Sequence, residues 1–118
     1  MTYEDIEQIH LMDWARLQQK AHPELELLFH IANERKSTPA AGQWMKQKGV
    51  KAGVPDLFLP VARNGKHGLW IELKRAGGGR LSEAQKEWLD RLRDEGYEAK
   101  VCHGFDDARK AIEEYLQW

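Results

Sequence analysis

Two carboxylates and a lysine are the side chains of this sequence best suited to do chemistry. Asp56 follows Pro55 at the start of a short apolar run, and Glu72 and Lys74 alternate with Leu73 in a second run. Because residues i and i+2 of a strand share a face, Glu72 and Lys74 should project together. If the two runs pair as a hairpin, Asp56 can join them.

This combination fits the metal-assisted hydrolysis of a phosphodiester. Mg²⁺ is held through one or two carboxylates while it keeps several waters, and it activates a bound water and stabilises charge on phosphoryl oxygens. A nearby lysine can orient the attacking water, help to deprotonate it, or stabilise the developing charge, and the sequence leaves these roles open. A bare Glu-X-Lys is more often a solvated ion pair of little energetic value. The surrounding sequence must therefore distinguish a catalytic pair from a surface ion pair.

The charge distribution favours the catalytic interpretation. The chain has 118 residues and a net charge of −1, but residues 35–80 carry ten lysines and arginines against only two acids, Asp56 and Glu72. Both flanking segments are acidic. A basic middle is the electrostatic pattern expected for phosphate contact, although lysines solvated on unrelated faces would give the same count.

The elements needed to position these residues can be predicted from periodicity and capping signals. We expect one domain over residues 1–118 with an α/β fold, a mixed sheet flanked by helices on both faces, in the order α-β-α-β-β-α-β-α. The first helix should place Ile6, Ile9 and Leu17 near one face. The predicted helices cover residues 3–20, 39–48, 83–95 and 106–116, and the predicted strands cover 25–32, 57–62, 68–74 and 97–103.

Composition excludes several other classes of protein. The single cysteine, Cys102, rules out a disulfide within the chain and any multi-cysteine zinc site. No apolar run approaches the roughly 20 residues of a membrane span, and the acidic N-terminus does not resemble a signal peptide. We therefore expect a cytoplasmic protein with no membrane partner.

The motifs together resemble the VRR-NUC family, the virus-type replication-repair branch of the PD-(D/E)XK nucleases. The resemblance covers roughly residues 4–103. It rests on the acidic first helix with Trp14, on residues 29–34 (Phe-His-Ile-Ala-Asn-Glu), on 49–57 (Gly-Val-Lys-Ala-Gly-Val-Pro-Asp-Leu), on 71–74 (Ile-Glu-Leu-Lys), and on 81–85 (Leu-Ser-Glu-Ala-Gln) with Trp88.

The resemblance implies roles for particular residues. The metal, Mg²⁺ or Mn²⁺, would be held by Asp56, Glu72 and the main-chain carbonyl of Leu73, and Lys74 would be the catalytic lysine. An acid on the first helix would complete the site. Glu7 is the assignment made here, and Glu4, one turn earlier, is the alternative.

Two further residues are implicated beside the centre. Gln85 is the last residue of a Ser-Glu-Ala-Gln capping box, which is a sufficient structural role, and the resemblance also implies a place for it near the active site. His30 stands where the family often has a histidine beside the site.

The resemblance also implies that the substrate is DNA. Lys48, Lys51, Arg75 and Arg80 are the candidate DNA-binding residues, with Arg35, Lys36 and Lys46 as weaker ones, and Gly77–Gly79 is expected to form a flexible loop along the DNA. Stand-alone relatives of this length resemble dimeric, structure-specific nucleases, including Holliday-junction resolvases. We therefore expect a homodimer that cuts branched or double-stranded DNA. The alternatives are a less selective nicking or flap nuclease, a non-catalytic DNA-binding module and, ranked low, a sequence-specific restriction-type enzyme.

Overall fold

Four strands form one sheet in the part of the chain that the computed structural model describes, residues 1–32 and 38–118. Their order across the sheet is their order in the sequence: β1 (Phe29–His30), β2 (Leu57–Leu59), β3 (Leu69–Lys74) and β4 (Glu98–His103). β1, β2 and β3 pair antiparallel, whereas β3 and β4 are parallel. A parallel pair needs a long crossover, which helix α3 (Glu83–Asp94) provides.

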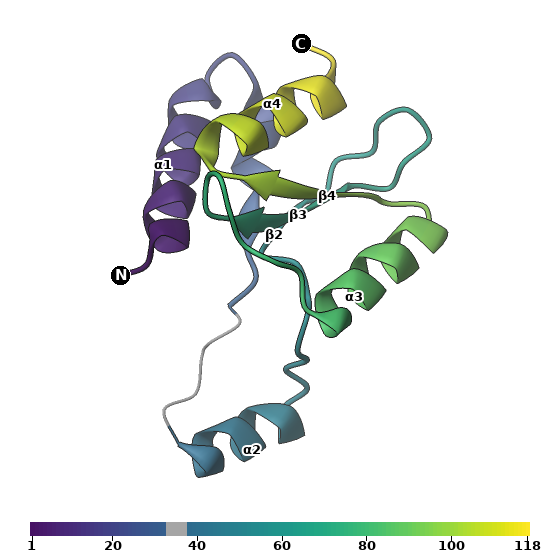
Figure 1. Ribbon diagram of the computed structural model, residues 1–118. Coiled ribbons are helices and arrows are strands. Elements are labelled where there is room, and N and C mark those ends of the chain that lie inside the picture. Colours follow the sequence, from purple (N-terminus) through teal and green to yellow (C-terminus); the bar gives the residue numbers. More distant parts are fainter. Residues whose placement is uncertain (33–37) are drawn as a thin grey trace.

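Helices cover both faces of this sheet (Figure 1). α1 (Tyr3–Gln18) and α4 (Phe105–Leu116) pack on one face, and α3 packs on the other. A 3₁₀ helix, η1 (Pro23–Leu27), leads into β1, and a further helix, α2 (Pro39–Gln47), lies away from the sheet. This is the mixed α/β architecture predicted above, with the predicted order of helices and strands.

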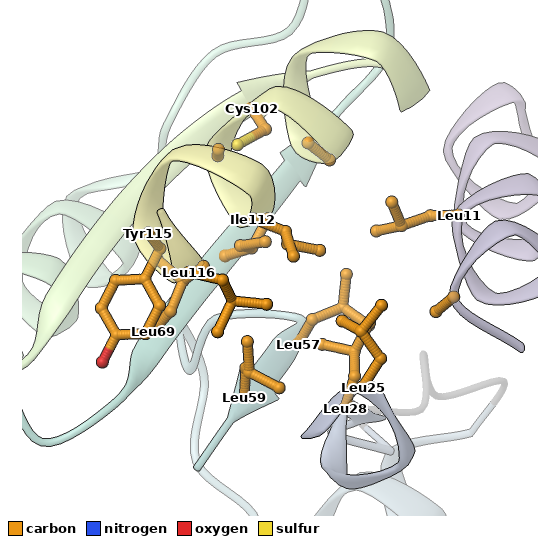
Figure 2. Close-up of a cluster of buried hydrophobic side chains, with 14 of the residues drawn as sticks. Leu11, Leu25, Leu28, Leu57, Leu59, Leu69, Cys102, Ile112, Tyr115 and Leu116 are labelled. Atoms are coloured by element: carbon orange, nitrogen blue, oxygen red, sulfur yellow. The ribbon is translucent and has the colours of Figure 1, made fainter. Parts of the chain in front are cut away.

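The alternation of side chains along β3 divides the interior into two clusters. Leu69, Ile71 and Leu73 are buried among leucines of β2, α1 and α4 (Figure 2). Trp70 faces the opposite way and packs with residues of α3 and β4. Because side chains two residues apart share a face, Glu72 and Lys74 lie on the same side of the sheet as Trp70, the side that α3 covers.

The predicted hairpin between β2 and β3 is confirmed. Arg63 and Lys66 exchange two backbone hydrogen bonds across Asn64 and Gly65, at 3.1 and 2.8 Å. Both central residues have positive φ, 51° and 75°, as the common two-residue hairpin turn requires. This turn fixes the register in which β2 approaches β3.

The strand predicted over residues 25–32 is wrong for most of its length. Residues 23–27 form η1 instead, and only Phe29 and His30 belong to a strand. Leu25 and Leu28 are both buried, and this spacing of three matches the 3₁₀ helix, in which residues i and i+3 eclipse. A short apolar run does not distinguish these two conformations by periodicity alone.

The first helix carries apolar residues on two sides. Ile6, Ile9 and Leu17 are 50%, 48% and 80% exposed, whereas Leu11 and Ala15 are buried. The apolar stripe therefore exists but faces outward, and a second, shorter set of small and aliphatic residues faces the core. Within the described residues, none of the helices is long and apolar enough to span a membrane.

Candidate active site

Strand β3 carries Glu72 and Lys74 on the face that α3 covers. The Glu72 side chain is almost fully buried, with 3% of the residue exposed. The Lys74 Nζ atom lies 3.6 Å from Glu72 Oε2, and only 14% of the Lys74 side chain is exposed. This pair is therefore not the solvated surface ion pair that a Glu-X-Lys motif usually forms.

Asp56 lies at the entrance to β2, beside the same end of β3. The register pairs Leu57 with Ile71, so Asp56 stands one residue beyond the last pair, next to Glu72. Its Oδ2 atom accepts a 2.7 Å hydrogen bond from the Leu73 backbone N–H. The hairpin thus brings Asp56, Glu72 and Lys74 together, as their spacing in the sequence predicts.

Gln85 connects the first turn of α3 to this group. Its Oε1 accepts from the Ser82 backbone N–H at 2.9 Å, which completes the predicted capping box. The same Oε1 accepts from Lys74 Nζ at 3.0 Å, and Nε2 donates to Glu72 Oε2 at 3.3 Å. A helix cap and an orienting contact to both charged groups are therefore made by one side chain.

A cavity of about 540 Å³ opens over these residues. Asp56, Glu72, Leu73 and Lys74 line one part of it. Because the Leu73 side chain is buried in the core, Leu73 presents its main chain to the cavity. The remaining lining comes from His30, from Ala52 and Gly53 before β2, and from the first turns of α1 (Thr2, Glu4, Asp5 and Gln8).

The loop of Gly77–Gly79 lies against the site. The His103 Nδ1 atom lies 2.8 Å from the Gly78 carbonyl oxygen. Gly79 has a φ of 91°, and a Cβ there would lie 3.1 Å from the Lys74 Cβ. The glycine therefore lets the loop lie against the aliphatic part of Lys74. The glycine run was visible in the sequence, but its contact with Lys74 was not.

Comparison with known proteins agrees with this arrangement. The family model of the VRR-NUC domain matches residues 2–106. This chain belongs to the VRR-NUC family. A solved structure described as a VRR_NUC domain protein is 36% identical and superposes with a TM-score of 0.82, over 99% of this chain and 90% of that one. No curated protein matches. VRR-NUC domains are nuclease domains, so the chain is placed among nucleases.

Within this VRR-NUC domain, Glu7 does not line the active-site cavity. Its Oε2 accepts a 3.2 Å hydrogen bond from the Phe105 backbone N–H, at the start of α4. The N-cap of α4 is Gly104, which has no side chain to cap the helix, so the Glu7 carboxylate takes that role. Glu4, by contrast, lines the cavity. The geometry favours the alternative, Glu4, as the acid that the first helix contributes.

Substitution of the two glutamates should separate these roles. Glu4→Gln should weaken activation by Mg²⁺ about tenfold or more, with little change in melting temperature, since the effect of a metal-site partner is of this size. Glu7→Gln should lower the free energy of unfolding by about 1 kcal/mol through the loss of a charged cap, and so lower the melting temperature, and it should leave metal activation intact. Metal titrations of cleavage, together with thermal melts, measure both. The reverse pattern would restore Glu7 as the ligand.

In the VRR-NUC site the buried carboxylate of Glu72 lies close to the carboxylate of Asp56. Burial and, after it, the charge of the nearby Asp56 raise the pKa of Glu72 to about 8, against the opposing effect of Lys74. A carboxyl with such a pKa holds its proton at neutral pH unless another cation compensates its charge. The site is thus short of positive charge, and a divalent cation would relieve this.

The donor set fits a Mg²⁺ or Mn²⁺ ion bound in the manner typical of phosphodiester chemistry. In the described part of the chain, no three His, Cys, Asp or Glu side chains form a cluster of metal-binding size. Mg²⁺ does not need one, because it commonly binds one or two carboxylates and retains waters and substrate phosphate oxygens. Asp56, Glu72 and the Leu73 carbonyl would hold it, with Glu4 across the cavity.

The shifted pKa of Glu72 predicts how stability depends on pH. In the metal-free protein the folded state keeps a proton up to about pH 8 that the unfolded chain releases near pH 4.5. This contribution to the free energy of unfolding is complete below pH 4.5 and is lost as pH rises through 8, about 5 kcal/mol in all. Glu72→Gln should flatten this decline in melts between pH 5 and 8, whereas the exposed Glu83→Gln should not. Parallel curves for wild type and Glu72→Gln would contradict the prediction.

Of the remaining predicted residues, His30 alone lines the cavity among the residues that the structure describes. The His30 Nδ1 atom lies 2.9 Å from the Asp56 carbonyl oxygen. Lys51 lines an adjoining groove beside Trp88. Lys46 and Lys48 are exposed on and after α2, and Arg75 and Arg80 are exposed beside the glycine loop. Arg35 and Lys36 lie outside the described residues.

Proposed function

We propose that this VRR-NUC domain is an endodeoxyribonuclease that requires Mg²⁺ or Mn²⁺ and cuts branched DNA as a homodimer, in the manner of a Holliday-junction resolvase. The observation that carries the proposal is the convergence of Asp56, Glu72 and Lys74 on one open cavity, with Gln85 bonded to both members of the buried pair. Burying the Glu72 carboxylate beside Lys74 is weak evidence for a stabilising role, so the arrangement is better explained by chemistry.

The chain's own residues perform distinct tasks in this chemistry. The metal ion, when bound, supplies a polarised water and neutralises charge on the phosphate. Asp56 is held by the Leu73 N–H, which keeps its carboxylate at the mouth of the hairpin. Lys74 is held by Gln85, so that its ammonium can hydrogen-bond to the attacking water or to a phosphoryl oxygen.

The surface around the cavity suits a polyanionic substrate. Lys48 and Lys51 come shortly before Asp56 in the sequence, and Arg75 and Arg80 come after β3. All four are exposed. Exposed lysines and arginines can bind the phosphates of a DNA strand and set its register. These four residues are therefore proposed as DNA contacts.

A homodimer would cover the exposed apolar stripe of α1. Tyr3, Ile6, Ile9 and Leu17 are 48% to 80% exposed, which is a large unpartnered apolar surface for a small domain. A two-fold symmetric pair presents the same stripe from each copy, and two active sites suit a substrate with two equivalent strands to cut.

Sedimentation velocity tests the dimer directly. At micromolar concentration we expect a species of about twice the chain mass of 13.7 kDa. Ile9→Glu should convert it to monomer, and Leu27→Glu should not, because Leu27 is equally exposed but lies on η1. Wild type that sediments as a monomer would contradict this part of the proposal.

A panel of labelled substrates tests the choice of DNA. Four-way junction, flap and linear duplex are incubated with the protein and Mg²⁺ or Mn²⁺. The proposal predicts cutting of the junction at a rate at least tenfold above the duplex. Equal cutting of all three would indicate a less selective nuclease of the same chemistry, and tight binding without cutting would indicate a binding module.

A further inference from the structure

Helix α2 is the one element of the described chain that stands away from the sheet and the other helices (Figure 1). Its nine residues include none that is buried. Within residues 1–32 and 38–118, no hydrogen bond or ion pair joins a side chain of α2 to another element, and the one side-chain bond at the helix is its own cap, from the Ala41 N–H to Thr38 Oγ1. A binding partner would supply the contacts that α2 does not make with the described residues.

The length of α2 supports the same conclusion. Isolated helices shorter than roughly 12–15 residues are marginal in water. Thr38 as N-cap and Pro39 at the first position help α2 to start, but they do not replace packing. Local capping signals therefore favour the start of α2, but α2 lacks the packing contacts that normally stabilise a helix of this length.

The chemistry of the segment indicates what the partner is. Residues 38–55 carry three lysines, Lys46, Lys48 and Lys51, and no acid. Trp44 is 63% exposed, and Lys48 follows it by four residues, so that both lie on one face. An exposed indole beside a cation suits a nucleic acid strand, because a base stacks on the ring while the ammonium pairs with a phosphate. Lysine is, by contrast, depleted in protein interfaces.

The position of α2 in the chain puts this face close to the proposed active site. Ala52 and Gly53 line the cavity, and Lys48 precedes Ala52 by four residues. Four residues span at most about 14 Å, which is about four steps of duplex DNA at 3.4 Å per step. Gly53 lies directly against the Ala84 backbone, and this contact fixes the loop to α3.

We propose that α2 recognises the branch point of the DNA: Trp44 stacks on a base exposed where the strands part, and Lys48 binds a neighbouring phosphate. Away from its ends, a duplex presents its base faces only to other bases, so internal stacking of this kind is available only where the strands part. The inference rests on the proposed nuclease function and adds the residue that gives the preference for branched DNA.

The test compares Trp44→Ala with Trp44→Phe and, as a matched control on the same helix, Gln43→Ala. Single-turnover cleavage is measured on a four-way junction and on linear duplex. Trp44→Ala should reduce junction cutting about tenfold, the effect expected for loss of one stacked base, with less than a twofold change on duplex. Trp44→Phe should restore most of the rate, since it keeps a ring to stack on, and Gln43→Ala should match wild type.

Binding without cleavage separates failure of this inference from failure of the nuclease proposal. In chelator, a 2-aminopurine placed at the branch should be quenched by wild type and by Trp44→Phe, but much less by Trp44→Ala. This readout holds even if wild type cuts nothing, a result that would reject only the nuclease proposal. The role of α2 in branch recognition would be overturned if Trp44→Ala lost cleavage equally on junction and duplex, or if it quenched 2-aminopurine as strongly as wild type. It would also be overturned if Trp44→Ala converted a dimer to monomer.

Discussion

Replacement of Lys74 by methionine is expected to reduce DNA cleavage by a factor of about 10³ while Mg²⁺ still binds. Methionine keeps a flexible apolar stem against Gly79 but removes the ammonium that Gln85 holds. A positioned proton donor or charge stabiliser contributes about 10²–10⁴ in rate. Single-turnover rates at saturating Mg²⁺ measure the loss of the chemical step.

The protein should remain folded in this variant, which makes the loss interpretable. Glu72 has a raised pKa and can keep its proton when Lys74 is gone, so no uncompensated charge is left in the interior. Lys86→Met is the matched control, because Lys86 is a half-exposed lysine on α3 paired only with Glu83. A Lys74→Met protein that retains a tenth of the wild-type rate would argue against a catalytic role for Lys74.

Gly53→Ala is expected to disable the site through the backbone, with no change to any charged residue. The φ of Gly53 is 92°, and a Cβ there would lie 2.6 Å from the Ala84 main-chain carbon. Since α3 and its capping residue Gln85 cannot move away without disturbing Lys74, the loop that precedes Asp56 must shift. We expect a loss of cleavage of about 10²-fold, the effect of a displacement of roughly 1 Å, and of about 3 kcal/mol in stability.

Gly49→Ala on the same loop is the control for this prediction. Gly49 also has a positive φ, 98°, but a Cβ there would meet nothing within 4 Å. It should cost only the backbone strain, about 1 kcal/mol, with cleavage near the wild-type rate. Thermal melts and cleavage assays distinguish the two. Similar losses for both variants would mean that strain, and not the contact with Ala84, explains the effect.

Local sequence signals predict much of this fold. Asn64-Gly65 predicts the turn that sets the register of β2 and β3, and Ser82 with Gln85 predicts where α3 begins. These short-range signals place Asp56, Glu72 and Lys74 on neighbouring strands before any tertiary contact is known. The capping role of Gln85 follows from the Ser-Glu-Ala-Gln sequence, whereas its place near the active site was implied only by the family resemblance.

The errors arise where tertiary packing decides between locally equivalent choices. Helix α1 carries apolar residues on two sides, and only the docking of α4 and the sheet selects Leu11 and Ala15 for the core over Ile6 and Ile9. The same docking turns Glu7 toward the start of α4 and leaves Glu4 in the cavity. Adjacent turns of one helix cannot be assigned to these places from spacing alone.

The metal dependence of cleavage by the wild-type protein tests the central claim most directly. Protein stripped with a chelator is mixed with four-way junction DNA and titrated with Mg²⁺, with Asp56→Asn treated in parallel. We expect no cutting without metal, cutting that rises and saturates with Mg²⁺, and no recovery in Asp56→Asn at any Mg²⁺ concentration. Cutting that persists in chelator, or Asp56→Asn that cuts at the wild-type rate, would contradict a metal-dependent centre built on Asp56, Glu72 and Lys74.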